Sequence, residues 1–489
     1  MIRRTGALLA ALALGACSLT PRYVRPDAAI PPQWPQGPAY QRQSPLPAAY
    51  AYRDCFADPR LLRLIATALV ANQDIAAALA NVEAARASYR VQRAALLPEI
   101  DAGAGYSRAG GQASIQPPET VSAGASVPAW ELDLFGRVRA LTAAERARYL
   151  GSIAAARAVR ILVVAELAQA WIARGRDMSL LAIARDTASS ASEQVALTAR
   201  RVAGGIAALD DQRKAEITLA TAQADIAAQT TAVAQDENAL RALVGGEPAP
   251  ADLPISIDDA GARFCAIPAG MDSAILLARP DVIEAEYALK AANADLGAAR
   301  AALFPRISLT AAAGVASTAL ASLFTGGAFA WSADANASYP LFTAGRGKAG
   351  VALAEARRKL AVAQYRKAIQ NAFRDVADTL ARRGTIDAQL AATRAGAAAA
   401  ADNARLTERR YTGGIASALD SLVARQTLYT ARRTAALTEA TRAANLVELY
   451  RAIGDDDPTL PFRPARPLQP APSDAIGSQT NPPRQGTPP

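Results

Sequence analysis

The chain has 489 residues, of which 51% are hydrophobic and only 5% aromatic, so alanine supplies much of its apolar content. Its formal net charge is +9, but both signs are spread along the sequence without basic clusters interleaved with aromatic residues, which argues against nucleic-acid binding. The sequence has no histidine, which excludes histidine-based triads, most zinc sites and the usual general base. Since no paired carboxylates or nucleophile–base pair stand out either, we expect no enzymatic activity, no cofactor and no metal site.

Residues 1–16 have the features of a lipoprotein signal peptide. Two arginines precede a short apolar run, and this run ends in Leu14-Gly15-Ala16-Cys17. We expect cleavage before Cys17 and acylation of this cysteine, for example with palmitate; an ordinary signal peptide with a chance cysteine is the alternative. Ser18 follows, and by its resemblance to lipoprotein sorting signals it favours the outer membrane. No later window holds about 18 uninterrupted strongly apolar residues, as a transmembrane helix would.

Residues 17–56 are rich in proline and predict an extended strap with little regular structure. Helices are expected to begin near Asp58, with Asn72 as a cap between two of them and the second helix running to Leu97. Cys55 and Cys265 could pair in an oxidising compartment or could both remain unpaired.

The chain then contains two similar halves. The first, residues 57–246, has short helices, strands at about 99–108 and 120–134, and a long helical hairpin that reverses at Gly204-Gly205. The first helix of this hairpin would be about 100 Å long. A linker at 247–271 leads to the second half, residues 272–454, with strands at about 306–316 and 328–340 and a hairpin that reverses at Gly413-Gly414. A proline-rich tail, residues 455–489, follows.

Both halves contain the same switch from a helical to a strand pattern, at Pro98 and at Pro305. Proline ends a helix and is tolerated at the start of a strand. The strand 328–340 alternates apolar and polar residues with aromatic residues at its ends, which is typical of a membrane β-strand, although a soluble sheet packed on one face fits as well. If the strands lie in a membrane, four are too few to close a barrel, so several copies of the chain must share one.

The sequence resembles the TolC-like outer-membrane efflux channels, specifically the lipoprotein branch of the NodT and OprM type. The resemblance spans nearly the whole chain in the order of the family. It rests on Leu14 to Cys17; Asp58-Pro59 with Leu61 and Leu64; Trp130-Glu131-Leu132-Asp133-Leu134-Phe135-Gly136-Arg137; Ala278-Arg279-Pro280-Asp281-Val282; Phe304 to Leu309; and Pro340-Leu341-Phe342.

The resemblance implies a mainly α fold with a small β part. A homotrimer would form a twelve-stranded β-barrel across the outer membrane, continued by a long periplasmic α-barrel. It also implies a passive exit duct for drugs or other small molecules. An inner-membrane pump of the RND type would deliver these through a periplasmic adaptor protein, and outer-membrane lipid would surround the barrel. The alternative is that this chain is itself a periplasmic coiled-coil adaptor or scaffold lipoprotein.

The resemblance also suggests site residues. The turns at Gly204, Gly205, Gly413 and Gly414 would be periplasmic tips where the adaptor docks. The alternative is that these glycines only allow the helical hairpins to reverse. Asp420 would help to close the pore, with Leu419 as an apolar constriction; a solvated charge at a helix end is the alternative. Aromatic residues at the strand ends are expected at the membrane interface: Trp130, Phe135, Trp331, Tyr339 and Phe342.

Overall fold

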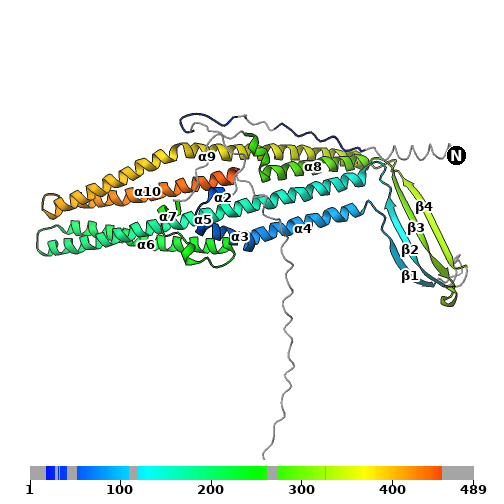
Figure 1. The fold of residues 1–489 in the computed structure, drawn as a ribbon, viewed down its shortest axis with the longest axis horizontal. Coiled ribbons are helices and arrows are strands. Elements are labelled where there is room, and N and C mark those ends of the chain that lie inside the picture. Colours follow the sequence, from blue (N-terminus) through cyan, green and yellow to red (C-terminus); the bar gives the residue numbers. More distant parts are fainter. Residues whose placement is uncertain are drawn as a thin grey trace, which may run out of the picture.

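The protein is elongated, with a β-sheet at one end and paired long helices over the rest of its length (Figure 1). This computed structural model describes residues 18–27, 31, 33–40, 52–108, 119–261, 273–324 and 327–453. The elements are α2 (Tyr52–Cys55), α3 (Pro59–Ala71), α4 (Gln73–Ala94), β1 (Asp101–Arg108), β2 (Glu119–Glu131), α5 (Arg137–Ala203), α6 (Leu209–Val244), η1 (Pro250–Asp252), α7 (Ile257–Gly261), η2 (Ser273–Ala278), α8 (Pro280–Ala301), β3 (Arg306–Ser317), η3 (Leu320–Ser322), β4 (Phe329–Ser338), α9 (Arg346–Thr412) and α10 (Ala418–Ile453).

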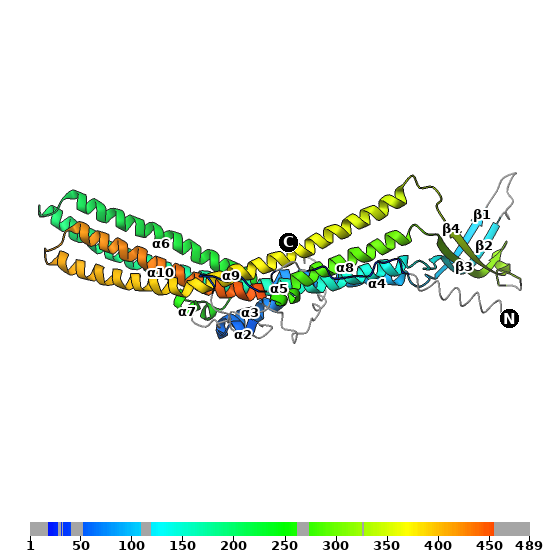
Figure 2. The same cartoon turned by 90° about the horizontal axis from the view of Figure 1, so that it is seen from above.

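Matched helix lengths reveal an internal repeat. Helices α5 and α9 each have 67 residues, α6 and α10 have 36, and α4 and α8 have 22. In the first half α4 and α6 follow one another along α5, and in the second half α8 and α10 follow one another along α9 (Figures 1 and 2). Each protomer therefore contributes four long helical strands, two from each half.

Asp58 and Asn72 begin two helices as the sequence predicts. Asp58 caps α3, and the side-chain oxygen of Asn72 accepts hydrogen bonds from the backbone of Asp74 and Ile75 at 2.9 and 3.1 Å. Helix α4 ends at Ala94 rather than at Leu97, because the residue before Pro98 disfavours helical backbone angles.

Within the part of the chain that the structure describes, no single helix is both long and apolar enough to cross a membrane. The bent pair α3 and α4 meets the length and composition criteria only when the two helices are taken together.

The four strands form one antiparallel sheet in the order β1-β2-β3-β4. Strand β2 ends at Glu131 rather than near 134, and β4 ends at Ser338, shortly before Pro340, rather than at 340. The register of β2 on β3 shifts between Val127 and Trp130, where Pro128 has no N–H to donate to the ladder.

The sheet has one apolar and one polar face. Paired residues lie on the same face, and the register pairs Trp331 with Ala313 and Asp334 with Thr310. We call the side that bears Asp334, Asn336, Ser308 and Thr310 the polar face. This alternation is the one that the sequence predicts.

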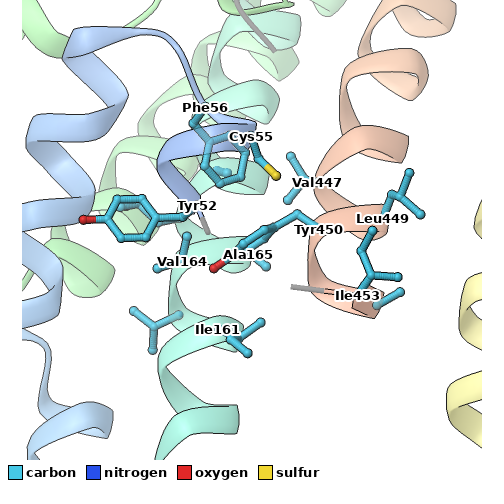
Figure 3. Close-up of a cluster of buried hydrophobic side chains, with 14 of the residues drawn as sticks. Tyr52, Cys55, Phe56, Ile161, Val164, Ala165, Val447, Leu449, Tyr450 and Ile453 are labelled. Atoms are coloured by element: carbon cyan, nitrogen blue, oxygen red, sulfur yellow. The ribbon is translucent and has the colours of Figure 1, made fainter. Parts of the chain in front are cut away.

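A cluster of buried hydrophobic side chains lies near the middle of the molecule, where α2, α5 and α10 meet (Figure 3). Phe56 packs edge-on against Tyr450, with 5.3 Å between ring centroids. Trp171, fully buried, donates its indole N–H to the carbonyl of Asp252 at 3.0 Å. The expected linker 247–271 is therefore more than a spacer, because its described part contains η1 and α7 and packs on α5 and α10.

Candidate functional site

Each helical hairpin reverses through the same glycine turn. The Ile206 amide donates to the Arg201 carbonyl at 3.0 Å, and Ile415 donates to Arg410 at 2.8 Å. Gly205 and Gly414 have φ values of 69° and 75°, which favour glycine, so the hairpin-turn reading is confirmed.

The first glycine of each pair has a different role from the second. Gly204 and Gly413 have φ values of −82° and −77°, which any residue adopts, so only the second glycine of each pair needs the positive φ. Beyond the glycines, Ile206 and Ile415 are 78% and 73% exposed, which leaves an apolar side chain at the end of each hairpin.

Asp420 begins α10 as part of a reciprocal cap with Ser417. Its carboxylate accepts hydrogen bonds from the Ser417 amide at 3.0 Å and hydroxyl at 2.8 Å, while its own amide donates to that hydroxyl at 3.1 Å. These bonds hold the pKa of Asp420 below its usual value. The side chain is exposed, as are those of Leu419 and Val423, so the expected gate residues lie at an accessible surface of the protomer.

A polar clasp that the sequence analysis missed joins the two hairpins. We define the clasp as Asp225 on α6 with Tyr429 and Arg433 on α10. The Tyr429 hydroxyl donates to Asp225, and the Arg433 guanidinium donates to the Asp225 carboxylate at 2.7 Å and to the Tyr429 hydroxyl at 2.8 Å. The spacing of Tyr429 and Arg433 along one helix face was a usable signal, but nothing local identifies Asp225 as their partner.

A partly open cavity of about 470 Å³ lies beside the clasp and is lined by residues of α5, α6, α9 and α10. Tyr429 contributes to its wall, as do Glu408 and Arg425, which form an ion pair at 2.8 Å. On the same wall Arg432 pairs with Asp186 of the other hairpin at 2.6 Å. Polar bonds across an incompletely filled interface hold the hairpins together here, rather than a continuous apolar core.

A second carboxyl group lies half-buried between the helices of the first hairpin. One oxygen of Asp236 on α6 is buried without a hydrogen-bond partner, and Asp177 on α5 is the nearby carboxylate. Burial, followed by the negative charge of Asp177, raises the pKa of Asp236 to about 7. Asp177 itself is paired with Arg176 at 2.6 Å.

The expected interface aromatics differ in exposure. Trp331, Tyr339 and Phe342 are exposed, by 72%, 54% and 89%. Trp130 is half-buried, and Phe135 stacks on Phe304 at 4.8 Å between ring centroids. Phe135 therefore joins the two halves at the helix–strand junction and is not a fully exposed aromatic residue.

Cys17 lies outside the described residues, but the strap that follows it is docked on α8. The Asn293 side chain donates to the Pro21 carbonyl at 2.8 Å, and Arg25 pairs with Glu286 at 2.6 Å. Gly297 makes room for the strap: a Cβ added there would lie 2.6 Å from the Cα of Thr20. The possible disulfide partner of Cys55, Cys265, also lies outside the described residues.

The sequence profile described as "Outer membrane efflux protein" matches residues 64–246 and 273–455, which are the two halves of the chain. The chain belongs to the outer membrane efflux protein family. It is 40% identical over 454 residues to the probable efflux pump outer membrane protein TtgC of Pseudomonas putida, with 91% of this chain and 93% of that protein covered. It is 38% identical over 456 residues to the outer membrane protein OprJ of Pseudomonas aeruginosa, with 92% and 95% covered.

Solved channels have the same fold. The Neisseria gonorrhoeae outer membrane channel MtrE, in its open state, superposes with a TM-score of 0.80 at 34% identity, covering 90% of this chain and 98% of that one. The outer-membrane channel OprN superposes with a TM-score of 0.81 at 26% identity, covering 90% and 99%.

These findings confirm the expected fold class, that of trimeric channels with a membrane β-barrel and a periplasmic α-barrel. The chain is an outer-membrane efflux channel protein with a large periplasmic part. The family match and the solved channel structures do not support the alternative that this chain is an adaptor or scaffold protein.

Proposed function

We propose that three copies of this chain form a passive exit duct for drugs or other small molecules. The observation that carries this proposal is the open four-stranded sheet, whose edge strands are β1 and β4. An open edge is costly in lipid, so β4 of one protomer pairs with β1 of the next, and three sheets close a ring of twelve strands. The polar face lines the lumen, and the apolar face with Trp331 and Tyr339 contacts lipid.

The duct spends no energy of its own. An inner-membrane pump of the RND type supplies the transport work, and a periplasmic adaptor links the pump to the hairpin tips. The turns at Gly204-Gly205 and Gly413-Gly414 dock the adaptor. Ile206 and Ile415 support this assignment, since an exposed apolar side chain at the end of each hairpin is a surface that a partner can bury.

The gate lies just behind the tips. Leu419 and Asp420 of three protomers narrow the lumen, and the clasp of Asp225, Tyr429 and Arg433 holds the second hairpin against the first. The duct exists in a closed arrangement with the clasp intact and an open one with the clasp broken. Adaptor binding favours the open arrangement. The cavity beside the clasp supports this reading, because loosely packed helices can move relative to one another at low cost.

Acylated Cys17 anchors the strap to the outer membrane. Thr20 already lies against Gly297 on α8, and three residues of extended chain reach at most about 10 Å. The anchor is therefore held near the helix–strand junction, at the periplasmic surface of the membrane. Trp130, Phe135, Tyr339 and Phe342 lie near the same boundary, and Trp331 lies nearer the distal ends of the strands.

Single-channel recording in planar bilayers tests the duct. We expect heat-resistant trimers in detergent and stable conductance steps after insertion, with larger conductance when the tip turns are deleted. A protein that remains monomeric and forms no pore would contradict the proposal.

A further inference from the structure

A recess lined with arginine lies between α5, α8 and α9, beside the start of β3. Its volume is about 470 Å³, and its walls carry Arg137, Arg148, Arg306, Arg357 and Asp295 above a floor of leucine and alanine side chains. A cavity of this size, with an apolar floor and a few convergent polar groups, has the composition of a small-molecule site.

The recess opens on the face of α8 that is opposite to the strap. The strap contacts Glu286, Asn293 and Gly297 of α8, whereas the recess is lined by Asp295 and Ala299. Successive helical residues are about 100° apart, so these two sets lie on opposite sides of the helix. In the proposed duct an acyl group on Cys17 has to reach lipid outside the barrel, which puts the strap on the outer surface of the tube. The recess, on the opposite side of α8, then faces the lumen.

The sheet gives the same orientation independently. Arg306 pairs in register with Ser338, which follows Asp334 and Asn336 at alternate positions of β4. Arg306 is therefore on the polar face, which faces the lumen of the proposed duct.

Two of the four arginines form no ion pair with any residue that the structure describes, although the charge of Arg357 acts on the nearby Asp295, which Arg148 already pairs with. Arg137 pairs with Glu131 and Arg148 pairs with Asp295, each at 2.5 Å. By contrast, Arg306 and Arg357 are exposed and form no side-chain hydrogen bond or ion pair with any residue that the structure describes. Three protomers would place six such guanidinium groups around one level of the lumen, where they attract anions.

We propose that this recess transiently binds amphipathic organic anions, meaning compounds with a carboxylate or sulfonate on an apolar body, as they pass through the duct. The inference rests on the proposed trimeric duct. The guanidinium groups of Arg306 and Arg357 receive the anionic group, because a planar guanidinium matches the geometry of such oxyanions. The leucine and alanine floor covers the apolar body. A small inorganic anion would gain only the contact with the guanidinium groups and none with the apolar floor.

Current block in planar bilayers tests the recess, with 1-naphthalenesulfonate as the probe. We expect wild-type channels to show resolved blocking events, and the double variant Arg306→Gln with Arg357→Gln to shorten them about tenfold. The double variant should also shift the reversal potential in a salt gradient toward cation selectivity. The matched control is Lys359→Gln, which removes one positive charge per protomer from an exposed position on the opposite side of α9 and should leave block unchanged.

Three outcomes would overturn the inference. One is the absence of block in a conducting wild-type channel, and another is equal block in the wild type and the double variant. The third is equally long block by inorganic phosphate, which would indicate a ring that selects charge alone. If the double variant forms no heat-resistant trimers, Arg357→Gln alone, on an exposed helix surface, is measured instead. A wild-type protein without any pore would contradict the duct itself, so the two failures are distinguishable.

Discussion

The Tyr429 hydroxyl donates a hydrogen bond to the carboxylate of Asp225, which is 204 residues away in the sequence. The bond joins α10 of the second half to α6 of the first, near the proposed gate. Arg433 completes the clasp by donating to both side chains. A buried hydrogen bond to a charged group is worth roughly 1.5–3 kcal/mol, enough to bias the relative position of two hairpins.

We therefore expect Tyr429→Phe to raise the leak conductance of the closed channel about tenfold, since it removes this hydrogen bond and preserves the ring. Single-channel recording and the sensitivity of cells to a large antibiotic measure the effect. Thr430→Val is the matched control, because that exposed hydroxyl bonds only to the carbonyl of Gln426 on its own helix. If Tyr429→Phe has the same leak conductance as the wild type, the clasp has no role in gating.

Asp420→Ala should also raise the leak conductance, but Asp420 has two roles to separate. The substitution removes a carboxylate from the proposed gate and also breaks the reciprocal cap with Ser417. Ser417→Ala breaks the cap and keeps the charge, so a gating role predicts a larger leak for Asp420→Ala than for Ser417→Ala. Equal conductance in the two variants would reduce Asp420 to a helix cap.

Asp236 should make the stability of the protein depend on pH. Its pKa in the folded protein is raised to about 7, above the ordinary value of 3.8, so the folded form binds this proton more tightly than the unfolded form does. The stabilisation is complete below about pH 4 and is lost as the pH rises through about 7. We expect the melting temperature to fall by roughly 2–4 °C between pH 5 and pH 8.

Asp236→Asn should remove most of this pH dependence in scanning calorimetry. Asp211→Asn on the same helix serves as the control and should retain the wild-type dependence. If the melting temperature of Asp236→Asn depends on pH as strongly as that of the wild type, the carboxyl pair of Asp236 and Asp177 does not cause the pH dependence of stability.

Gly297→Ala should detach the strap from α8. The added methyl group would lie 2.6 Å from the Cα of Thr20, and a backbone atom cannot move aside as a flexible side chain can. We expect limited proteolysis to cut residues 18–40 several times faster. Gly396→Ala is the control, because a Cβ at that position on α9 meets nothing within 4 Å. Equal cleavage rates in the two variants would contradict the docking.

Cys17→Ser tests the lipid anchor. Loss of metabolic palmitate labelling is expected, while trimer formation should persist because the sheet and the long helices do not depend on the anchor. Labelling that survives the substitution would place acylation at another residue.

Much of the fold could be predicted from local physical chemistry. Pro98 and Pro305 end helices because proline lacks an N–H and restricts the residue before it, and the alternation after each one gave the strands. The glycine pairs located both hairpin reversals. The bounds of β2 were less predictable, since Pro128 disturbs the ladder and the strand still continues to Glu131.

The sequence by itself determined the duplicated plan, the helix and strand periods, the turn positions and, through its motifs, the family. These features depend on backbone angles and on the alternation of side chains within a few residues. Only the tertiary structure decided that Asp225 meets Tyr429, that Asp236 lies half-buried near Asp177, and that Arg306 and Arg357 share a recess. Such contacts join residues from distant segments, and their identity depends on how the long helices align side by side, which no local pattern specifies.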